Sequence, residues 1–336
     1  MTKLNIIKDK EYRNAMQQTV LPFLNAQKEK GSFARVSGQN LNYEHFPALP
    51  GNAAPAGDIV MVHGFTENIS KLYETAWYFL NSGFRVWLLQ QRGHGASYRT
   101  VKDPSLVHIR NYKDLVEDLH YFVAEIVKPA LAAEAAAAGG AGSPLYLFGH
   151  SMGGGVSTLY LERYPDDFKK AILSSPMLEI SAGNIPIPVA VGFARLMIRL
   201  RKGNTYMPGS TPFSEKPDFE NSCTTCPERY NDYFEAALSD PELQMSAPSV
   251  QTSLQFLYIT REAMKPSNIK KVKAKVLLLQ AGLDNMVLPG AQDSFISQVA
   301  DGRIVRFPEA KHEIYRCCDT TLERYWDAIL SFLSEE

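Results

Sequence analysis

Cysteine is scarce in this sequence, and neither sign of charge dominates it. Four cysteines in 336 residues are too few for a disulfide scaffold and are typical of a protein in a reducing compartment. Lysine and arginine number 35 and aspartate and glutamate 36, which gives a formal charge of −1. Basic clusters with interleaved aromatic residues are absent, so we expect no nucleic-acid partner.

Long apolar runs are also missing from the sequence. No stretch approaches the roughly 20 apolar residues that a membrane span requires. The segment Met1 to Gln18 is polar and lacks the apolar core of a secretory signal peptide. We therefore expect a cytoplasmic protein, with peripheral contact at the inner face of the membrane left open. Apolar residues make up 45% of the chain, which suits one large domain with an insertion.

Short apolar runs alternate with helical patterns from about Ala56 onward. The runs expected to form strands are residues 58–63, 85–90, 145–149, 171–174, 275–280 and 303–307. The helices expected between and after them are residues 69–82, 112–131, 152–164, 291–299 and 321–333. Continuous apolar strands suit a parallel sheet that is buried on both faces. The alternation predicts an α/β fold with a mostly parallel, doubly wound sheet, and polar alternation over 33–46 predicts antiparallel edge strands.

Two segments interrupt this pattern. The alanine-rich residues 130–143 are of low complexity and are interpreted as a frayed helix end followed by a flexible loop. Residues 178–267 contain no buried-strand run, but helical stretches are expected at 189–200, 230–238 and 249–264. We interpret residues 178–267 as a helical cap, inserted into a core domain that comprises residues 1–177 and 268–336.

The strongest local motif is Gly149-His150-Ser151-Met152-Gly153, which matches G-x-S-x-G. It follows an expected strand and precedes an expected helix, as in a nucleophile elbow. A serine on such a sharp turn has strained backbone angles, and the glycines leave room for it. The alternative is a glycine-rich turn that only packs a strand on a helix. The context of the motif favours Ser151 as a nucleophile.

A serine hydroxyl needs a base, and seven histidines compete for that role. His312 is favoured because it lies in the loop after the last expected strand, at the carboxyl edge of the sheet. His63 and His94 also end strands, but both precede the serine in sequence. In folds with a G-x-S-x-G nucleophile elbow, the order along the chain is serine, acid, histidine. The ring of His150 is better interpreted as a support for the turn. The other three, His45, His108 and His120, are interpreted as surface or core residues.

The acid that orients the base should lie between the serine and the histidine in sequence. Asp284 fits because it ends the turn Ala281-Gly282-Leu283-Asp284 after the strand 275–280. A turn-capping aspartate is the alternative interpretation of this residue. Asp293 and Asp301 are weaker candidates, since they fall on the following helix and the next loop.

An oxyanion hole would complete the site. One donor is expected to be the backbone N–H of Met152, directly after the nucleophile. The second is expected in the loop His63-Gly64-Phe65-Thr66, with the Phe65 N–H as donor and Gly64 allowing the close bend. Taken alone, a His-Gly pair after a strand would indicate only a turn.

These motifs appear in the same order as in a known family. The loop 63–65, Gln91-Arg92-Gly93-His94-Gly95-Ala96-Ser97, the elbow, Gly282-Leu283-Asp284 and Lys311-His312-Glu313 resemble the monoacylglycerol lipase and bacterial lysophospholipase branch of the α/β-hydrolases. Residues 108–122 and 229–233 are more similar to the lysophospholipases. The likeness covers about 57–333 and is weakest in the cap, and the alanine-rich insert departs from it. It implies ester hydrolysis of a single-acyl-chain lipid without metal or organic cofactor. It assigns the triad to Ser151, Asp284 and His312, and the oxyanion donors to Phe65 and Met152.

Several alternatives stay open at this level. The substrate is a small lipid or ester, and a carboxylesterase of short-chain or feruloyl-type esters is the nearest rival. A ligand-binding homologue without catalysis and a peptidase are weaker options. The apolar cap stretch 185–200, with basic residues at its end, could line an acyl tunnel, rest on anionic lipid or pack on the body. Cys223 and Cys226 have the spacing of a metal or redox pair, but four free thiols are favoured. Oligomeric state is not indicated.

Overall fold

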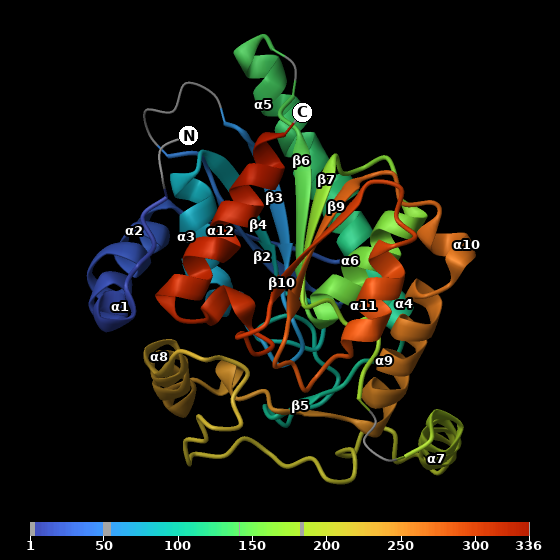
Figure 1. The fold of residues 1–336 in the computed structure, drawn as a ribbon. Helices are drawn as coiled ribbons and strands as arrows, with labels where there is room; N and C mark the ends of the chain where they lie inside the picture. The colour runs from blue at the N-terminus through green and yellow to red at the C-terminus, as the bar shows by residue number, and fades with distance from the viewer. Residues whose placement is uncertain (1–3, 50–54, 141, 182–184, 336) are drawn as a thin grey trace.

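The computed structural model describes residues 4–49, 55–140, 142–181 and 185–335. Residue 141 of the predicted loop and residues 182–184 of the predicted cap lie outside them. An eight-stranded sheet with the order β1-β2-β4-β3-β6-β7-β9-β10 forms the centre of the molecule (Figure 1). Strand β2 pairs antiparallel with both neighbours, and every other pairing is parallel. The predicted α/β fold with a mostly parallel sheet is confirmed.

Six of the eight strands arise where the apolar runs predicted them; β2 lies within the predicted edge segment 33–46, and β1 lies almost entirely before it. Their bounds are β1 Glu29–Phe33, β2 Leu41–Phe46, β3 Gly57–Val62, β4 Phe84–Leu89, β6 Leu145–His150, β7 Lys170–Ser174, β9 Lys275–Ala281 and β10 Gly302–Phe307. All residues of β3, β6 and β7 are buried, because helices cover both faces of the sheet. The edge strands β1 and β10 are more exposed, because each has a neighbouring strand on one side only.

Alternate residues of each central strand supply two separate cores. In β3, Ile59 and Met61 pack toward α3 (Tyr73–Asn81) and α12 (Asp319–Ser334). Val60 and Val62 pack on the other face, toward α4 (Tyr112–Tyr121), α6 (Met152–Arg163) and α11 (Pro289–Ile296). The two groups of helices lie on opposite sides of the sheet in Figure 1. This is the doubly wound arrangement, and it gathers the strand ends at one edge.

Some helices differ from the sequence expectation. The N-terminal residues form α1 (Tyr12–Ala15) and α2 (Leu21–Gln27), joined by a π-helical stretch, which the sequence did not indicate. The helix that begins with α4 continues through a π-helical stretch into α5 (Lys128–Ala138) and ends at Gly139 in a left-handed conformation. The alanine-rich segment is therefore helical as far as Ala138, because alanine is the best helix former and Gly139 caps the end.

The segment between β7 and β9 contains the three predicted helices and a short fourth one. They are α7 (Ile187–Arg199), α8 (Pro227–Ser239), α9 (Val250–Ala263) and α10 (Pro266–Ile269). A short strand β8 (Ala247–Pro248) pairs with β5 (Leu106–Val107). Helix α9 packs against α6 of the sheet layer, whereas α7 contacts the rest through α9 and projects outward (Figure 1). In the described part of the chain, no helix combines the length and hydropathy that a membrane crossing requires.

Arg229 holds α8 to the body of the molecule. Its guanidinium is fully buried and forms ion pairs with Glu74 on α3, at 2.7 Å, and with Asp9, at 2.6 Å. Its backbone carbonyl accepts a hydrogen bond from the guanidinium of Arg316. A buried charge of this kind needs such partners, so α8 and the N-terminal residues are fixed together.

The buried carboxyl group of Glu162 should make the stability of the protein depend on pH. Glu162 lies near the end of α6, is only 3% exposed, and neither carboxyl oxygen has a hydrogen-bond partner among the described residues. Burial, with a smaller contribution from Glu262, raises the pKa of Glu162 from 4.5 to about 9. The folded state therefore binds this proton more tightly than the unfolded state, and stability falls as pH rises between these two values. Glu162→Gln should make the decrease in unfolding free energy between pH 5 and pH 8 smaller by about 4 kcal/mol, measured by urea unfolding.

The exposed Glu242 provides the matched control. Glu242→Gln should leave the pH dependence of the unfolding free energy as it is in the wild type. An unchanged pH slope in Glu162→Gln would contradict the assignment of a buried, protonated carboxyl at this position.

Candidate functional site

Ser151 occupies the turn between β6 and α6 in a left-handed conformation, with φ of 52° and ψ of −119°. Three backbone hydrogen bonds hold this unfavourable geometry. The Ser151 N–H donates to the carbonyl of Ser174 at 3.1 Å, and the Ser151 carbonyl accepts from Gly155 and Met177 at 3.0 and 2.8 Å. Strain of this kind persists only where the surroundings fix it. Here the strained turn presents the serine hydroxyl at the carboxyl ends of the strands, within hydrogen-bonding distance of His312.

The three candidate triad residues meet at the carboxyl ends of β6, β9 and β10. Nε2 of His312 lies 2.8 Å from Oγ of Ser151, and Nδ1 of His312 lies 2.6 Å from a carboxyl oxygen of Asp284. The carboxylate accepts from Nδ1–H, so Nε2 is free to accept the proton of the serine hydroxyl. All three side chains are almost fully buried, with 9% of Ser151 exposed. The arrangement can deprotonate a serine during attack on a carbonyl carbon.

Asp284 stays ionised in this site although it is buried. Burial alone would raise the pKa of Asp284, but the hydrogen bond from His312, the charge of that ring and two backbone hydrogen bonds together outweigh burial and lower the pKa. The backbone N–H groups of Met286 and Val287 also donate to this carboxylate, at 2.8 and 3.1 Å. The other two aspartates have different partners: Asp293 pairs with Arg306, and Asp301 lies 4.0 Å from Lys275. The turn after β9 thus presents one carboxylate to the imidazole.

The loop after β3 lies against the first turn of α6. A Cβ atom on Gly153 would overlap the backbone carbonyl oxygens of Val62 and His63, so only glycine permits this approach. Among the described residues, neither the Phe65 N–H nor the Met152 N–H has a hydrogen-bond acceptor. Two free backbone donors, one of them at the N-terminus of α6 directly after Ser151, have the chemistry to hold an oxyanion.

The remaining histidines have structural partners. His63 and His94 are buried after β3 and β4, and their Nδ1 atoms donate to the carbonyls of Gly64 and Arg92. His150 donates from Nδ1 to the carbonyl of Ser174 at 3.1 Å, as expected for a ring that supports the turn. Burial lowers the pKa of His150 to about 4, so this ring is neutral at pH 7.

A cluster of buried charges next to the site was not anticipated from the sequence. Glu67 accepts the Gly64 N–H at 2.5 Å and the Tyr315 hydroxyl at 2.8 Å. Lys71 lies 3.6 Å from Glu67 and 2.5 Å from Glu313, the residue after His312. Isolated charged residues are usually exposed on the surface, so the sequence did not indicate this cluster. Its one signal was that Glu67 and Glu313 lie next to the His63–Thr66 and Lys311–His312 motifs.

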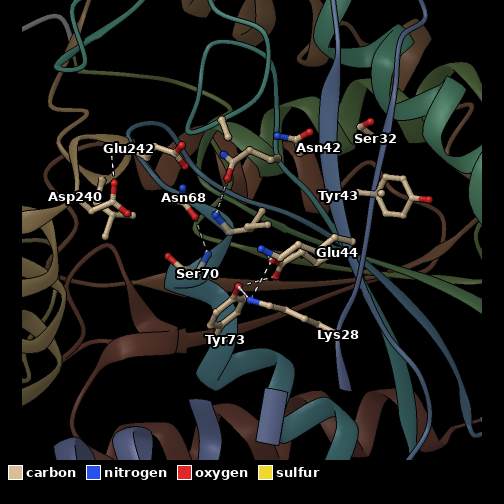
Figure 2. A pocket seen from close by; sticks show the side chains of 16 residues that line it. Lys28, Ser32, Asn42, Tyr43, Glu44, Asn68, Ser70, Tyr73, Asp240 and Glu242 are labelled. Carbon is tan, nitrogen blue, oxygen red and sulfur yellow. Dashed lines mark hydrogen bonds and ion pairs between the residues drawn. The ribbon is translucent and has the colours of Figure 1, made fainter. Parts of the chain in front are cut away.

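A separate polar pocket of about 580 Å³ lies beside residues 68–70 (Figure 2). Tyr73 donates to Glu44 at 2.6 Å, and Lys28 lies 3.4 Å from the same carboxylate. Asn68 accepts from the N–H of Ser70 and begins the 3₁₀ turn Ile69–Leu72. None of the triad residues lines this pocket.

The cysteines carry no disulfide. Cys226 and Cys317 are buried, and Cys223 contributes its carbonyl to a hydrogen bond from the Glu313 N–H at 2.8 Å. Burial raises the pKa of the Cys226 and Cys317 thiols to about 11. Across the described residues, no three His, Cys, Asp or Glu side chains are grouped as metal ligands.

The sequence of this chain is similar to those of known enzymes. Lysophospholipase L2 of Escherichia coli K12 is 27% identical over 266 residues, which cover 76% of this chain and 74% of that protein. A monoacylglycerol lipase of Mycolicibacterium smegmatis is 31% identical over 174 residues, 51% of this chain and 54% of that protein.

Solved structures agree on the fold. A soluble variant of monoglyceride lipase from Saccharomyces cerevisiae, in complex with a substrate analog, superposes with a TM-score of 0.70 at 20% identity, over 92% of this chain and 95% of that one. A carboxyl esterase from Bacillus coagulans, in complex with glycerol, gives 0.69 at 17% identity, over 91% and 98%. Residues 53–317 match the sequence profile of the family described as "Serine aminopeptidase, S33", Hydrolase_4. The chain therefore belongs to the Hydrolase_4 family of α/β-hydrolases, among the esterases and lipases.

Proposed function

We propose that this protein is a serine hydrolase that cleaves the carboxylic ester of a single-acyl-chain lipid, a lysophospholipid or a monoacylglycerol. The observation that carries the proposal is the hydrogen-bonded series from Ser151 through His312 to Asp284, with distances of 2.8 and 2.6 Å. The similarity to lysophospholipase L2 and to monoacylglycerol lipase supports this substrate class.

The reaction has two halves. His312 takes the proton of Ser151 as Oγ attacks the ester carbonyl, and the Phe65 and Met152 N–H groups hold the resulting oxyanion. The protonated imidazole then gives its proton to the departing alcohol, which leaves an acyl group on Ser151. Water, deprotonated by His312, attacks the acyl-enzyme and releases the fatty acid. Asp284 keeps the imidazole oriented and stabilises its charge throughout.

An apolar groove of about 510 Å³ supports an acyl-chain substrate. Its lining includes Leu178, Ile180, Ile187, Val191 and Leu257. Leu178 follows Met177, whose N–H donates to the Ser151 carbonyl, so this end of the groove lies near Ser151 in space. We propose that residues 178–267 form a cap whose α7 and α9 border the acyl chain.

A hydrolysis panel tests the proposal. Wild-type protein should hydrolyse long-chain monoacylglycerols or lysophospholipids with a higher kcat/KM than short-chain or feruloyl esters or aminoacyl anilides. Ser151→Ala should lower the rate by about five to six orders of magnitude, because the nucleophile is lost. Full activity of Ser151→Ala would reject the mechanism. A preference for short-chain or aromatic esters would instead favour a carboxylesterase.

The exposed apolar surface of α7 favours a second property, contact with an anionic lipid surface. Large parts of Ile187, Val189 and Leu196 are exposed, at 44%, 60% and 55%. Arg199 lies on the last turn of the same helix, with Arg201 and Lys202 after it. Apolar side chains flanked by basic ones are typical of helices that lie in a membrane interface.

Flotation with lipid vesicles tests this contact. Wild-type protein should float with vesicles containing anionic phospholipid, and less with neutral vesicles or at high salt, because the basic residues contribute electrostatically. The double variant Val189→Glu, Leu196→Glu should lose flotation. The matched control Val36→Glu changes an exposed valine in the β1–β2 connection and should float like the wild type. Wild-type protein that stays at the bottom of the gradient would exclude membrane contact.

A further inference from the structure

The direction of the Phe65 N–H is determined by the side chain of His63. The Phe65 N–H and the Gly64 carbonyl belong to one peptide group, which is planar and trans, so they point in opposite directions. Nδ1 of His63 lies 2.8 Å from the Gly64 carbonyl oxygen. A hydrogen bond to that oxygen therefore fixes where the N–H on the other side of the peptide points.

The protonation of His63 follows from its second ring nitrogen. Nε2 lies 3.0 Å from the backbone N–H of Gln91, which can only donate, so Nε2 is the acceptor. The proton of the neutral ring is then on Nδ1, where it can be donated to the Gly64 carbonyl. Burial lowers the pKa of this fully buried imidazole and keeps it neutral. His63 is thus a fixed donor and is not available as a base.

Glu67 holds the preceding peptide group. Its Oε2 accepts the Gly64 N–H at 2.5 Å, and its Oε1 accepts the Tyr315 hydroxyl at 2.8 Å. A Cβ atom on Gly64 would lie 3.0 Å from Oε2 of Glu67 and from the ring of His150, so the contact is close on both sides. Two successive peptide groups of the loop are therefore each held by one buried side chain.

The charge of Glu67 is maintained at a cost. Burial would raise the pKa of Glu67, but the positive charges of His150, when that ring is protonated, and of Lys71 outweigh this effect and lower the pKa. At pH 7, where His150 is neutral, Lys71 is the cation that balances Glu67. Buried ion pairs are often no more stabilising than apolar residues of the same size, so stability alone accounts poorly for a carboxylate here. Lys71 bridges Glu67 to Glu313, the neighbour of His312, and thereby joins the loop to the segment of the base.

We propose that His63 and Glu67 are positioning residues that clamp the two peptide groups before Phe65 and aim its N–H at the oxyanion. The proposal rests on the serine-hydrolase function proposed above. Neither side chain needs to touch the substrate. Their effect is expected on the tetrahedral species that carries the oxyanion, and much less on binding of the ester itself.

Two substitutions at His63 separate the two ring nitrogens. In His63→Asn the side-chain amide nitrogen takes the place of Nδ1 and can still donate to the Gly64 carbonyl. In His63→Gln the side chain reaches the position of Nε2 and leaves that carbonyl without its donor. We expect kcat to fall about 10- to 100-fold in His63→Gln, with KM within about twofold, and to fall less than about fivefold in His63→Asn.

The readouts are chosen so that a loss of folded protein cannot imitate the effect. The number of competent sites is taken from complete labelling with a fluorophosphonate, and kcat is expressed per labelled site. A trifluoromethyl ketone measures the oxyanion hole directly, because Ser151 adds to its carbonyl carbon, the proton passes to His312 and the oxygen becomes an oxyanion. The inhibition constant should rise by the same factor as kcat/KM falls.

Glu67 offers a second pair of variants with matched controls. Tyr78 donates its hydroxyl to buried Glu74 at 2.7 Å, as Tyr315 does to Glu67, but on α3. Glu67→Gln and Tyr315→Phe should lower kcat per site about tenfold and threefold, since the clamp is loosened. Glu74→Gln and Tyr78→Phe should leave it within about twofold, even where they lower the melting temperature.

Each failure has a distinct outcome. If His63→Gln and Glu67→Gln have wild-type kcat and inhibition constants per site, the positioning role is wrong while the hydrolase function stands. If kcat falls but binding of the ketone does not, the two residues act on the base and the proposal is also overturned. A wild-type protein that fluorophosphonate does not label at Ser151 would reject the proposed function itself.

Discussion

The rest of the site depends on the left-handed backbone of Ser151. That residue can sit at φ of 52° only because Ser174, Gly155 and Met177 hold its peptide groups. The same contacts place the start of α6 against the end of β3, where Gly153 touches the carbonyl of Val62. One strained residue thereby sets both the direction of the hydroxyl and the position of the N–H that follows it.

Much of the fold was predictable because it depends on local sequence. Continuous apolar runs such as β3 and β6 can be stable only between two helical layers, so their sequence implies their neighbours. Ser151, Asp284 and His312 could be proposed as a group because each follows an apolar strand, and parallel strands end at one edge. The structure brings the three together within hydrogen-bonding distance.

What the sequence could not indicate depends on contacts between distant segments. Lys71 and Glu313 are 242 positions apart, and each resembles a surface charge until the chain is folded. The N-terminal helices are short, and Arg229 joins Asp9 at their start to Glu74 on α3. Local sequence propensity carries no information about ion pairs between distant segments. It also does not predict short helices such as α1 and α2, because these gain their stability from tertiary packing. The alanine-rich segment was predicted as a frayed helix end followed by a loop, and the helix runs on to Ala138 because alanine favours the helical conformation.

Because Arg229 holds only α8 to the body, the two helices α7 and α8 between β7 and β9 differ in how firmly they are fixed. Helix α8 shares this guanidinium with α3 and the N-terminal residues, and its neighbouring loop meets the segment of His312 through Cys223. Helix α7 has only Ala194 buried and is held through Val250 and Leu254 of α9. Sequence divergence among descendants of this chain can therefore accumulate on α7 without disturbing the contacts that bring Ser151, His312 and Asp284 together.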